Sequence, residues 1–313
     1  MESSTKQEDV DKEVCANCGK AQVDGTKKVF KKCACNLVKY CNDNCQENHR
    51  PHHEETCKQQ LSKLRRDNQL FTQNEETHVG DCPICALPIR LEHGKYVVND
   101  CCSKMICCGC DFHNQFREVK MGLENERKCI FCRQPVPSSK KIALDHQKRR
   151  VEADDPDAIT LLGAKRYHDG DYRSAYEYWS KAATLGSIDA HYNLSLLYGT
   201  GQGVEKDATK EVHHLEVAAI AGHTIARHNL GCNEGRKGNM ERSKSHFIIG
   251  ANLGDDHCLK AIQGYFKSGI VTNEEYAAAL CAHQAAIDAA KSPQREEAEN
   301  NVVYQRQMGA LMK

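Results

Sequence analysis

The sequence predicts a multidomain protein in which two small cysteine-rich folds precede an all-α solenoid. Sixteen of the 19 cysteines lie within residues 1–132, and most of them form short pairs. From residue 153 onward cysteine is scarce, and strings rich in Ala, Leu, Gly and Tyr recur, with their closing glycines 36 and 32 residues apart. The first pattern is typical of folds held together by metal ions, and the second of stacked helical repeats.

Composition and charge restrict the class of protein. The 313 residues include 43 acidic and 43 basic side chains, so the charge balance does not favour direct nucleic-acid binding. Residues 1–14, which we expect to be disordered, lack the apolar core of a signal peptide, and no long apolar run predicts a membrane span. We expect a soluble protein of the cytoplasm or nucleus. Thiols in such a reducing compartment favour metal binding over disulfides.

The first cysteine cluster offers eight metal ligands within residues 15–57. It contains "CANC", "CAC", "YCNDNC" and "HEETC". Two nearby thiolates can reach one tetrahedral zinc ion, and a segment with so few large apolar residues would gain its folding energy from the metal. Spacing to Cys57 favours His53 as the histidine ligand over His49 and His52.

Residues 15–57 resemble the MYND-type zinc finger. Two departures from the family stand out: "CAC" is one residue shorter than the usual pair, and Arg50 replaces the Trp of peptide-binding members. The second departure speaks against the capture of proline-rich peptides. The resemblance implies two interleaved zinc sites, formed by Cys15, Cys18, Cys41 and Cys45 and by Cys33, Cys35, His53 and Cys57.

A second cluster lies in residues 81–136, with "CPIC", "CCSKMICCGC" and "CIFC" in that order. It resembles a RING finger, a cross-braced domain that holds two zinc ions. In this family one ion takes the first and third pairs of ligands, and the other takes the second and fourth. The implied sites are Cys82, Cys85, Cys107 and Cys110 for the first ion, and Cys101, Cys102, Cys129 and Cys132 for the second.

The second pair of this RING-like finger departs from the family. The commonest pattern has histidine at the place of Lys104, and a charged lysine has no lone pair to offer a metal. Cys102 lies five positions before the third pair, as in the all-cysteine RING variant, which leaves Cys101 as its partner and His113 as the fallback ligand. Cys108 is then the one cysteine of the two fingers that binds no metal. Four zinc ions are expected in all.

The RING resemblance also implies a partner and an activity. RING domains hold a ubiquitin-charged E2 enzyme in a reactive pose, which is catalysis by positioning and electrostatics without a nucleophile of their own. The positions that match the family's E2-contact surface are Ile84, Phe112, Phe116, Arg133 and Pro135, whereas Ile130 replaces the usual proline between the last two ligands. The leading interpretation is a protein-binding adaptor that acts as a RING-type E3 ubiquitin ligase. The alternatives are a non-enzymatic scaffold and a chromatin-associated regulator.

Residues 154–290 are predicted to form about four helical repeats. "ITLLGAKRY", "HYNLSLLYG" and "RHNLGCNEG" align, "KAIQGYFKSG" is a weaker copy, and a second helical stretch ending in Gly follows each of the first three. These strings resemble Sel1-like repeats, relatives of the tetratricopeptide class that scaffold protein complexes through a concave face. Leu162, Leu194 and Leu230 recur at one repeat position and are expected in the core, as is Trp179, the only tryptophan.

The remaining segments connect these modules. Residues 58–80 are predicted to be a helical linker, residues 137–153 a second linker, and residues 291–313 a polar C-terminal tail. The three late cysteines are expected to be small buried residues: Cys232, Cys258 and Cys281. The predicted fold class is therefore two zinc-stabilised cross-brace fingers, MYND and RING-like, followed by an all-α Sel1/TPR-like solenoid.

Overall fold

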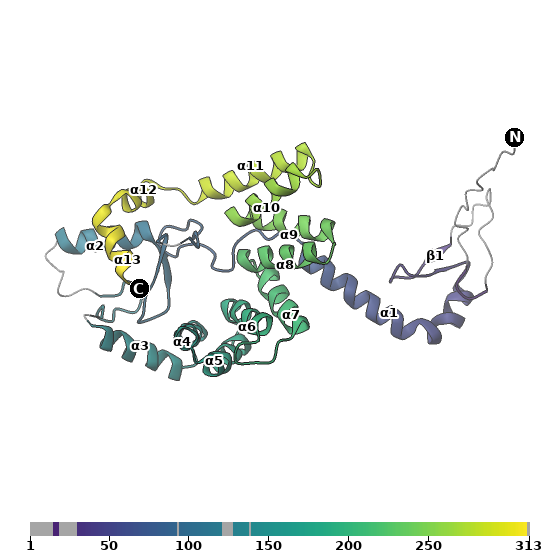
Figure 1. Ribbon diagram of the computed structural model, residues 1–313, viewed down its shortest axis with the longest axis horizontal. Helices are drawn as coiled ribbons and strands as arrows, with labels where there is room; N and C mark the ends of the chain where they lie inside the picture. The colour runs from purple at the N-terminus through teal and green to yellow at the C-terminus, as the bar shows by residue number, and fades with distance from the viewer. Residues whose placement is uncertain (1–14, 19–29, 93, 121–127, 138, 312–313) are drawn as a thin grey trace. The chain divides into compact units, whose positions relative to one another are not determined.

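The computed structural model describes residues 15–18, 30–92, 94–120, 128–137 and 139–311 (Figure 1). The chain divides into two compact units, Met1–Phe71 and Thr72–Lys313. Residues 1–14, for which disorder is expected, lie outside the described residues. Within the described part, no helix is both long and apolar enough to cross a bilayer.

The first unit is a small cysteine-rich fold that leads into one long helix. Strands β1 (Lys31–Lys32) and β2 (Lys39–Tyr40) pair antiparallel, and α1 extends over Asp43–Phe71. The expected linker helix is thus the continuation of a helix that begins inside the finger, and it ends at Phe71 rather than at residue 80. Among the described residues of this unit, few buried apolar side chains other than cysteine are present, which fits a fold that depends on metal.

The second unit begins with the other cysteine-rich fold. Strands β3 (Tyr96–Val98) and β4 (Met105–Cys107) form an antiparallel hairpin, and α2 (Cys108–Lys120) follows β4 directly. The third cysteine pair therefore spans the end of a strand and the first turn of a helix. Helix α3 (Lys140–Glu152) then leads to the solenoid and occupies most of the second predicted linker.

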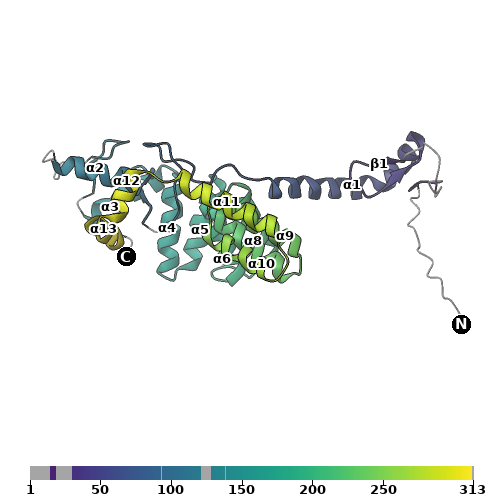
Figure 2. The ribbon, with the colours of Figure 1, turned by 90° about the horizontal axis from the view of Figure 1, so that it is seen from above.

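The solenoid consists of consecutive helix pairs, as predicted. Within each pair and between pairs, neighbouring helices in the sequence pack against each other (Figure 1, Figure 2). Gly186 and Gly222, two of the expected helix ends, have φ values of 92° and 89°, a left-handed conformation that glycine adopts without strain. The helices are α4 (Pro156–His168), α5 (Tyr172–Thr184), α6 (Ile188–Thr200), α7 (Ala208–Ile220), α8 (Thr224–Arg236), α9 (Met240–Asn252), α10 (Asp256–Lys267) and α11 (Asn273–Ala289).

Packing within the repeats places a small residue of one helix against a large residue of the next. Trp179 is 2% exposed, and a Cβ added to Gly163 would lie only 2.5 Å from its Nε1. Gly231 faces Phe247 at the equivalent place two repeats later, also at 2.5 Å. Trp179 is therefore a core residue, and its indole N–H donates to the Thr160 carbonyl over 3.0 Å.

The expected core residues have mixed outcomes. Leu194 and Leu230 are buried, whereas Leu162 is only partly buried. Cys258 is buried and Cys232 is partly buried, but Cys281 is exposed on α11, so its expected burial was wrong. Helix α11 lies at the end of the repeats and has no following repeat to cover its outer face.

The polar C-terminal segment forms two helices, α12 (Pro293–Asn300) and α13 (Val302–Leu311). Helix α12 packs against α2 of the RING-like fold (Figure 1, Figure 2). The segment that composition alone describes as a tail is therefore part of the second unit.

Candidate metal centres

The structure brings the sixteen predicted ligands together in four groups. In each group, one ligand atom from every residue lies within 4.8 Å of the other three. The groups are Cys15, Cys18, Cys41 and Cys45; Cys33, Cys35, His53 and Cys57; Cys82, Cys85, Cys107 and Cys110; and Cys101, Cys102, Cys129 and Cys132. Both fingers therefore have the interleaved pairing of a cross-brace.

Distances between ligand atoms fit a tetrahedral zinc ion. With Zn–S bonds of about 2.3 Å, two sulfurs of a tetrahedron lie about 3.8 Å apart. The Sγ–Sγ distances are 3.8 Å for Cys85–Cys107, 3.6 Å for Cys102–Cys129 and 3.5 Å for Cys33–Cys57. Sets of three or four thiolates, with at most one imidazole, are the ligands typical of structural zinc. The residues present fit zinc.

The backbone after the cysteine pairs repeats one conformation. The N–H of Ala86 donates to the Cys82 carbonyl over 2.8 Å, and the N–H of Arg133 donates to the Cys129 carbonyl over 3.0 Å. This tight turn, a zinc knuckle, lets both thiols of a pair reach one point. Among the described non-glycine residues, five have left-handed φ values, and the four that directly follow a cysteine pair are Asn36, Ala86, Ser103 and Arg133.

Backbone N–H groups also point at the sulfurs. Burial by itself would raise the pKa of the Cys82 thiol, but donors that include the backbone N–H groups of Cys107 and Cys85 bring this pKa down to about 7. The Cys107 N–H lies 3.5 Å from the Cys82 sulfur, and the Cys110 N–H lies 3.4 Å from the Cys107 sulfur. Such donors stabilise thiolates, the form that binds metal.

In the first finger, His53 occupies the ligand position. Its Nε2 lies 3.0 Å from the Cys35 sulfur, and the side chain is buried. His49 instead bonds through Nδ1 to the Tyr40 hydroxyl over 3.0 Å, and neither His49 nor His52 belongs to the group. Arg50 is exposed and lines a surface groove of about 480 Å³ with His53 and other finger residues.

In the second finger, the adjacent Cys101 and Cys102 both face Cys129 and Cys132. The fallback His113 lies outside this group, with its Nε2 3.0 Å from a Glu297 carboxylate oxygen. Residues 99–104 form a tight turn in which the N–H groups of the second cysteine and of the next residue both donate to the Asn99 carbonyl. This turn makes chelation by neighbouring cysteines geometrically feasible.

Cys108 lies outside all four groups. It is buried against Phe112, Ala298 and Tyr304, and burial together with the nearby Cys107 thiolate raises the pKa of its thiol to about 11. A thiol held neutral in an apolar core is a poor metal ligand.

The five expected E2-contact positions differ in exposure. Ile84 is 46% exposed and Phe116 is 44% exposed, and Arg133 and Pro135 are exposed as well. Phe112 is only 8% exposed, because the ring of Tyr304 from α13 packs on it with centroids 5.3 Å apart. Four of these side chains are thus accessible to a partner, and Phe112 is not.

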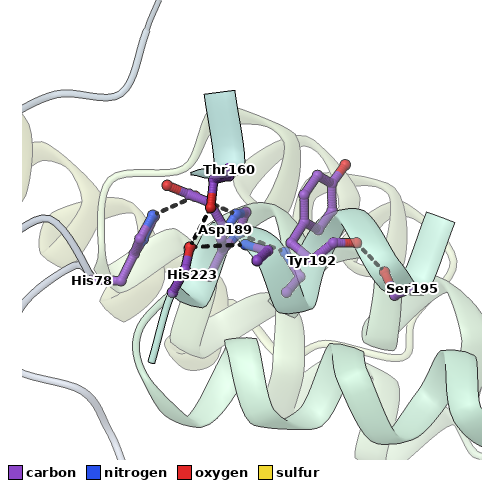
Figure 3. Close-up of polar contacts among 9 residues, drawn as sticks. His78, Thr160, Asp189, Tyr192, Ser195 and His223 are labelled. Carbon is purple, nitrogen blue, oxygen red and sulfur yellow. Dashed lines mark hydrogen bonds and ion pairs between the residues drawn. The ribbon is translucent and has the colours of Figure 1, made fainter. Parts of the chain in front are cut away.

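A fifth cluster of possible ligands joins the segment before the RING-like finger to the repeats (Figure 3). His78 Nε2 lies 3.0 Å and His223 Nε2 lies 3.4 Å from the same Asp189 oxygen, and the two imidazoles stack. Burial opposes ionisation of Asp189, but hydrogen bonds from His223 and His78 prevail and hold the pKa of this carboxyl well below its usual range. Sequence analysis missed this cluster, because His78 and Asp189 are far apart in the chain and match no ligand spacing.

The hydrogen bonds of His223 favour a hydrogen-bonded bridge over a metal site. Its Nδ1 accepts from the Ala226 N–H over 3.2 Å and so caps α8. In the neutral imidazole, Nε2 then carries the proton and donates to Asp189, whereas binding of a metal at Nε2 would require the proton on Nδ1. We therefore assign a structural role to the cluster.

Comparisons with known proteins agree with this architecture. Residues 15–57 match the family model of the MYND finger, and residues 156–187 and 188–223 match that of the Sel1 repeat. HcpC from Helicobacter pylori is 44% identical over 52 residues, which are 17% of this chain and 18% of that protein. The rat protein DAP3-binding cell death enhancer 1 is 38% identical over 55 residues, 18% of this chain and 11% of its own length.

A solved structure of a Sel1 repeat protein from Oxalobacter formigenes is 28% identical, with a TM-score of 0.35, and covers 39% of this chain and 97% of that one. The chain spans less than a fifth of the length of the two curated relatives, and their whole-protein activities therefore do not transfer to it. The chain combines a zinc-binding MYND finger with Sel1 repeats, and two further cysteine groups lie between them.

Proposed function

We propose that this protein is a zinc-dependent adaptor that binds proteins through its Sel1 repeats and MYND finger and recruits a ubiquitin-charged E2 enzyme through residues 81–136. A zinc finger joined to Sel1 repeats is the make-up of a protein-interaction adaptor. The ligase part of the proposal is supported chiefly by one observation. Ile84, which lies in the first zinc knuckle where RING fingers contact E2, has its apolar side chain 46% exposed.

Four zinc ions are part of the proposal, two in each finger. When bound, zinc supplies folding energy and fixes the knuckles, and it takes no part in ubiquitin transfer. Native mass spectrometry of the intact chain should give a mass increase of four zinc ions. Three ions would remove the site built on the adjacent Cys101 and Cys102.

The proposed role of the chain is to position and polarise the E2–ubiquitin conjugate. Ile84 and Phe116 offer apolar surface for the E2, and Arg133 offers a planar guanidinium whose several donors can bridge E2 and ubiquitin. Holding the flexible ubiquitin in one orientation lowers the entropy cost of attack on the thioester by an amine. No residue of this chain has to form a covalent intermediate.

A non-enzymatic scaffold is the second candidate, and the burial of Phe112 favours it. The side chain expected to extend the E2 surface along α2 is covered by Tyr304. A finger whose helix is already occupied within its own chain has less surface to offer an E2. In this alternative both fingers only bind partner proteins.

The deciding experiment measures ubiquitin discharge from a panel of charged E2 enzymes. We expect the wild-type chain to accelerate discharge with at least one E2, and Arg133→Ala and Ile84→Glu to lose most of that acceleration. Ile142→Glu is the matched control, because Ile142 on α3 is similarly exposed, at 40%, and lies outside the finger. If protein with four bound zinc ions accelerates discharge from no E2, the ligase proposal is wrong and the non-enzymatic scaffold is the remaining candidate.

A further inference from the structure

The C-terminal helices α12 and α13 are fitted to the RING-like finger in detail. Arg295, only 5% exposed, begins the contact from α12, and Ala298 is fully buried beside Cys108. The Tyr304 hydroxyl of α13 donates to an Asp111 carboxylate oxygen over 2.8 Å and lies 3.3 Å from the Cys108 carbonyl.

Two polar pairs, of which Lys95–Glu299 is an ion pair, border this contact. Lys95 Nζ lies 2.7 Å from a Glu299 oxygen, and His113 Nε2 lies 3.0 Å from a Glu297 oxygen. Both pairs are partly exposed and contribute little energy by themselves, but they fix the register of α12 along the finger. Buried apolar groups at the centre and ion pairs at the rim are features of a stable interface.

Arg295 contacts the first zinc knuckle directly. One terminal nitrogen of its guanidinium donates to the Cys85 sulfur over 3.4 Å and to the Leu87 carbonyl over 3.0 Å. The other donates to the carbonyls of Pro88 over 2.6 Å and Ala290 over 2.7 Å. A single buried cation therefore ties a proposed zinc ligand, the turn that follows it and the end of α11 together.

The Arg295 guanidinium and the proposed zinc–thiolate site have opposite charges. Four thiolates around one Zn²⁺ carry a net charge of −2, and a low-dielectric environment makes that charge costly. A guanidinium is equally costly to bury without a partner, and the thiolates provide one. Donors in this outer position orient a ligand and strengthen its hold on the metal. Among the described residues, the hydrogen-bond acceptors of the Arg295 guanidinium are the Cys85 sulfur and backbone carbonyls, so the thiolates are its anionic partners.

The finger has a matching feature at Gly109, in the first turn of α2. A Cβ at this position would lie 2.8 Å from the Arg295 backbone nitrogen and 2.9 Å from its Cγ. Only glycine allows α12 to approach α2 this closely. The sequence "CCGC" thus places, between the ligands Cys107 and Cys110, the one residue type that the docked helix requires.

We propose that α12 and α13 form an intramolecular, zinc-dependent clasp, in which Arg295 partly neutralises the site formed by Cys82, Cys85, Cys107 and Cys110 through its contact with the Cys85 sulfur. Zinc at this site and docking of the clasp then stabilise each other. Loss of the metal releases the knuckle whose Cys85 sulfur and Leu87 carbonyl hold the guanidinium, so the clasp opens and exposes Phe112. The inference rests on the proposed zinc binding by this finger.

The test uses the full-length chain and variants of Arg295. Zinc transfer to a chromogenic chelator is followed together with hydrogen exchange of residues 293–306. In Arg295→Met we expect one of four zinc ions to be released about 10–100-fold faster, as when outer-shell partners are lost at other metal sites, together with faster exchange in residues 293–306. Arg295→Lys keeps the positive charge but loses the several donors of the guanidinium. Its zinc release should therefore be faster than that of the wild type and slower than that of Arg295→Met. Arg306→Met is the matched control, because Arg306 is exposed on α13.

Gly109→Ala is an independent variant, because it pushes α12 away while Arg295 stays intact. We expect it to accelerate exchange in residues 293–306 and the release of the same zinc ion. Four bound ions with unchanged release and exchange in Arg295→Met and Gly109→Ala would overturn the clasp. Fewer than four ions in the wild-type protein would instead contradict the zinc sites of the proposed function. The two failures are therefore distinguishable.

Discussion

The buried side chains of the RING-like finger are mainly thiols, whereas those of the first repeats are aliphatic and aromatic. The finger core holds Cys82, Cys107 and Cys110 with two isoleucines. The core of the first repeats holds Trp179 among leucine, isoleucine and alanine side chains. One region thus depends on an ion that draws its thiols together, and the other on the fit between helices. Perturbations that damage one region should leave the other intact.

Removal of zinc should separate the two regions most strongly. Structural zinc contributes about 10–16 kcal/mol per ion in small fingers, far more than any single side-chain contact. With a strong chelator we expect the finger signals in a two-dimensional NMR spectrum to collapse. Fluorescence of Trp179, the only tryptophan, should stay that of a buried indole. A shift of its emission to that of an exposed indole would show that the repeats depend on the metal as well.

Two glycines at equivalent repeat positions allow the packing between helices of the repeats to be tested. A Cβ at Gly163 would meet Trp179 at 2.5 Å, whereas a Cβ at Gly264 would have nothing within 4 Å. Gly163→Ala should destabilise the repeats by about 1–3 kcal/mol through overpacking. Gly264→Ala should stabilise them by up to about 1 kcal/mol, because alanine is the better helix former. Urea unfolding followed by Trp179 fluorescence measures both, and equal effects would refute the packing account.

Acid should weaken the repeats through two buried histidines, and the effect of each is much smaller than that of zinc removal. Burial, and then neighbouring positive charges, lower the pKa of His214 to about 4 and that of His246 to about 3. The unfolded chain takes up these protons near pH 6.5, so stability is complete above that pH and falls below it. Each histidine should cost about 1 kcal/mol between pH 7 and pH 5.5.

The measurement is again urea unfolding observed through Trp179, which reports on the repeats and not on the loss of zinc in acid. His214→Gln should lower the pH dependence without abolishing it. Identical stability at the two pH values would mean that these imidazoles are hydrated in the folded protein. The pKa of Asp189 is also lowered, but its contribution is lost only below about pH 4.

The sequence was most informative where ligands or repeats are close together in the chain. Cysteine spacing located the ligand pairs, because a knuckle places its two thiols within a few residues, and the family resemblance predicted which pairs come together, including the group with Cys101 and Cys102. Helix pairs followed from the recurring small residues and closing glycines. The choice of His53 over His49 and His52 also followed from spacing, and the structure brings His53 to the group.

Contacts between distant segments could not be predicted in this way. The burial of Phe112 depends on Tyr304, and the position of Arg295 depends on a turn that ends at Pro88, more than 200 residues earlier. A polar helix such as α12 has no apolar stripe, so its sequence does not indicate which face packs against another element. Its contact with α2 depends on its own buried Arg295 and Ala298 and on the absence of a side chain at Gly109.

The left-handed residues after the cysteine pairs have a consequence for natural variation. At most exposed positions a β-branched residue is harmless and glycine is unfavourable, but at a left-handed position this ranking is inverted. If all twenty residues are tested at Ala86 or Arg133 and folded protein is selected, glycine and asparagine should be enriched and isoleucine and valine depleted. This ranking follows from the backbone conformation and not from the contacts of the side chain. Arg133→Gly therefore deletes the guanidinium while it spares the turn. Evolution can lose the proposed ubiquitin contact at this position and keep the finger.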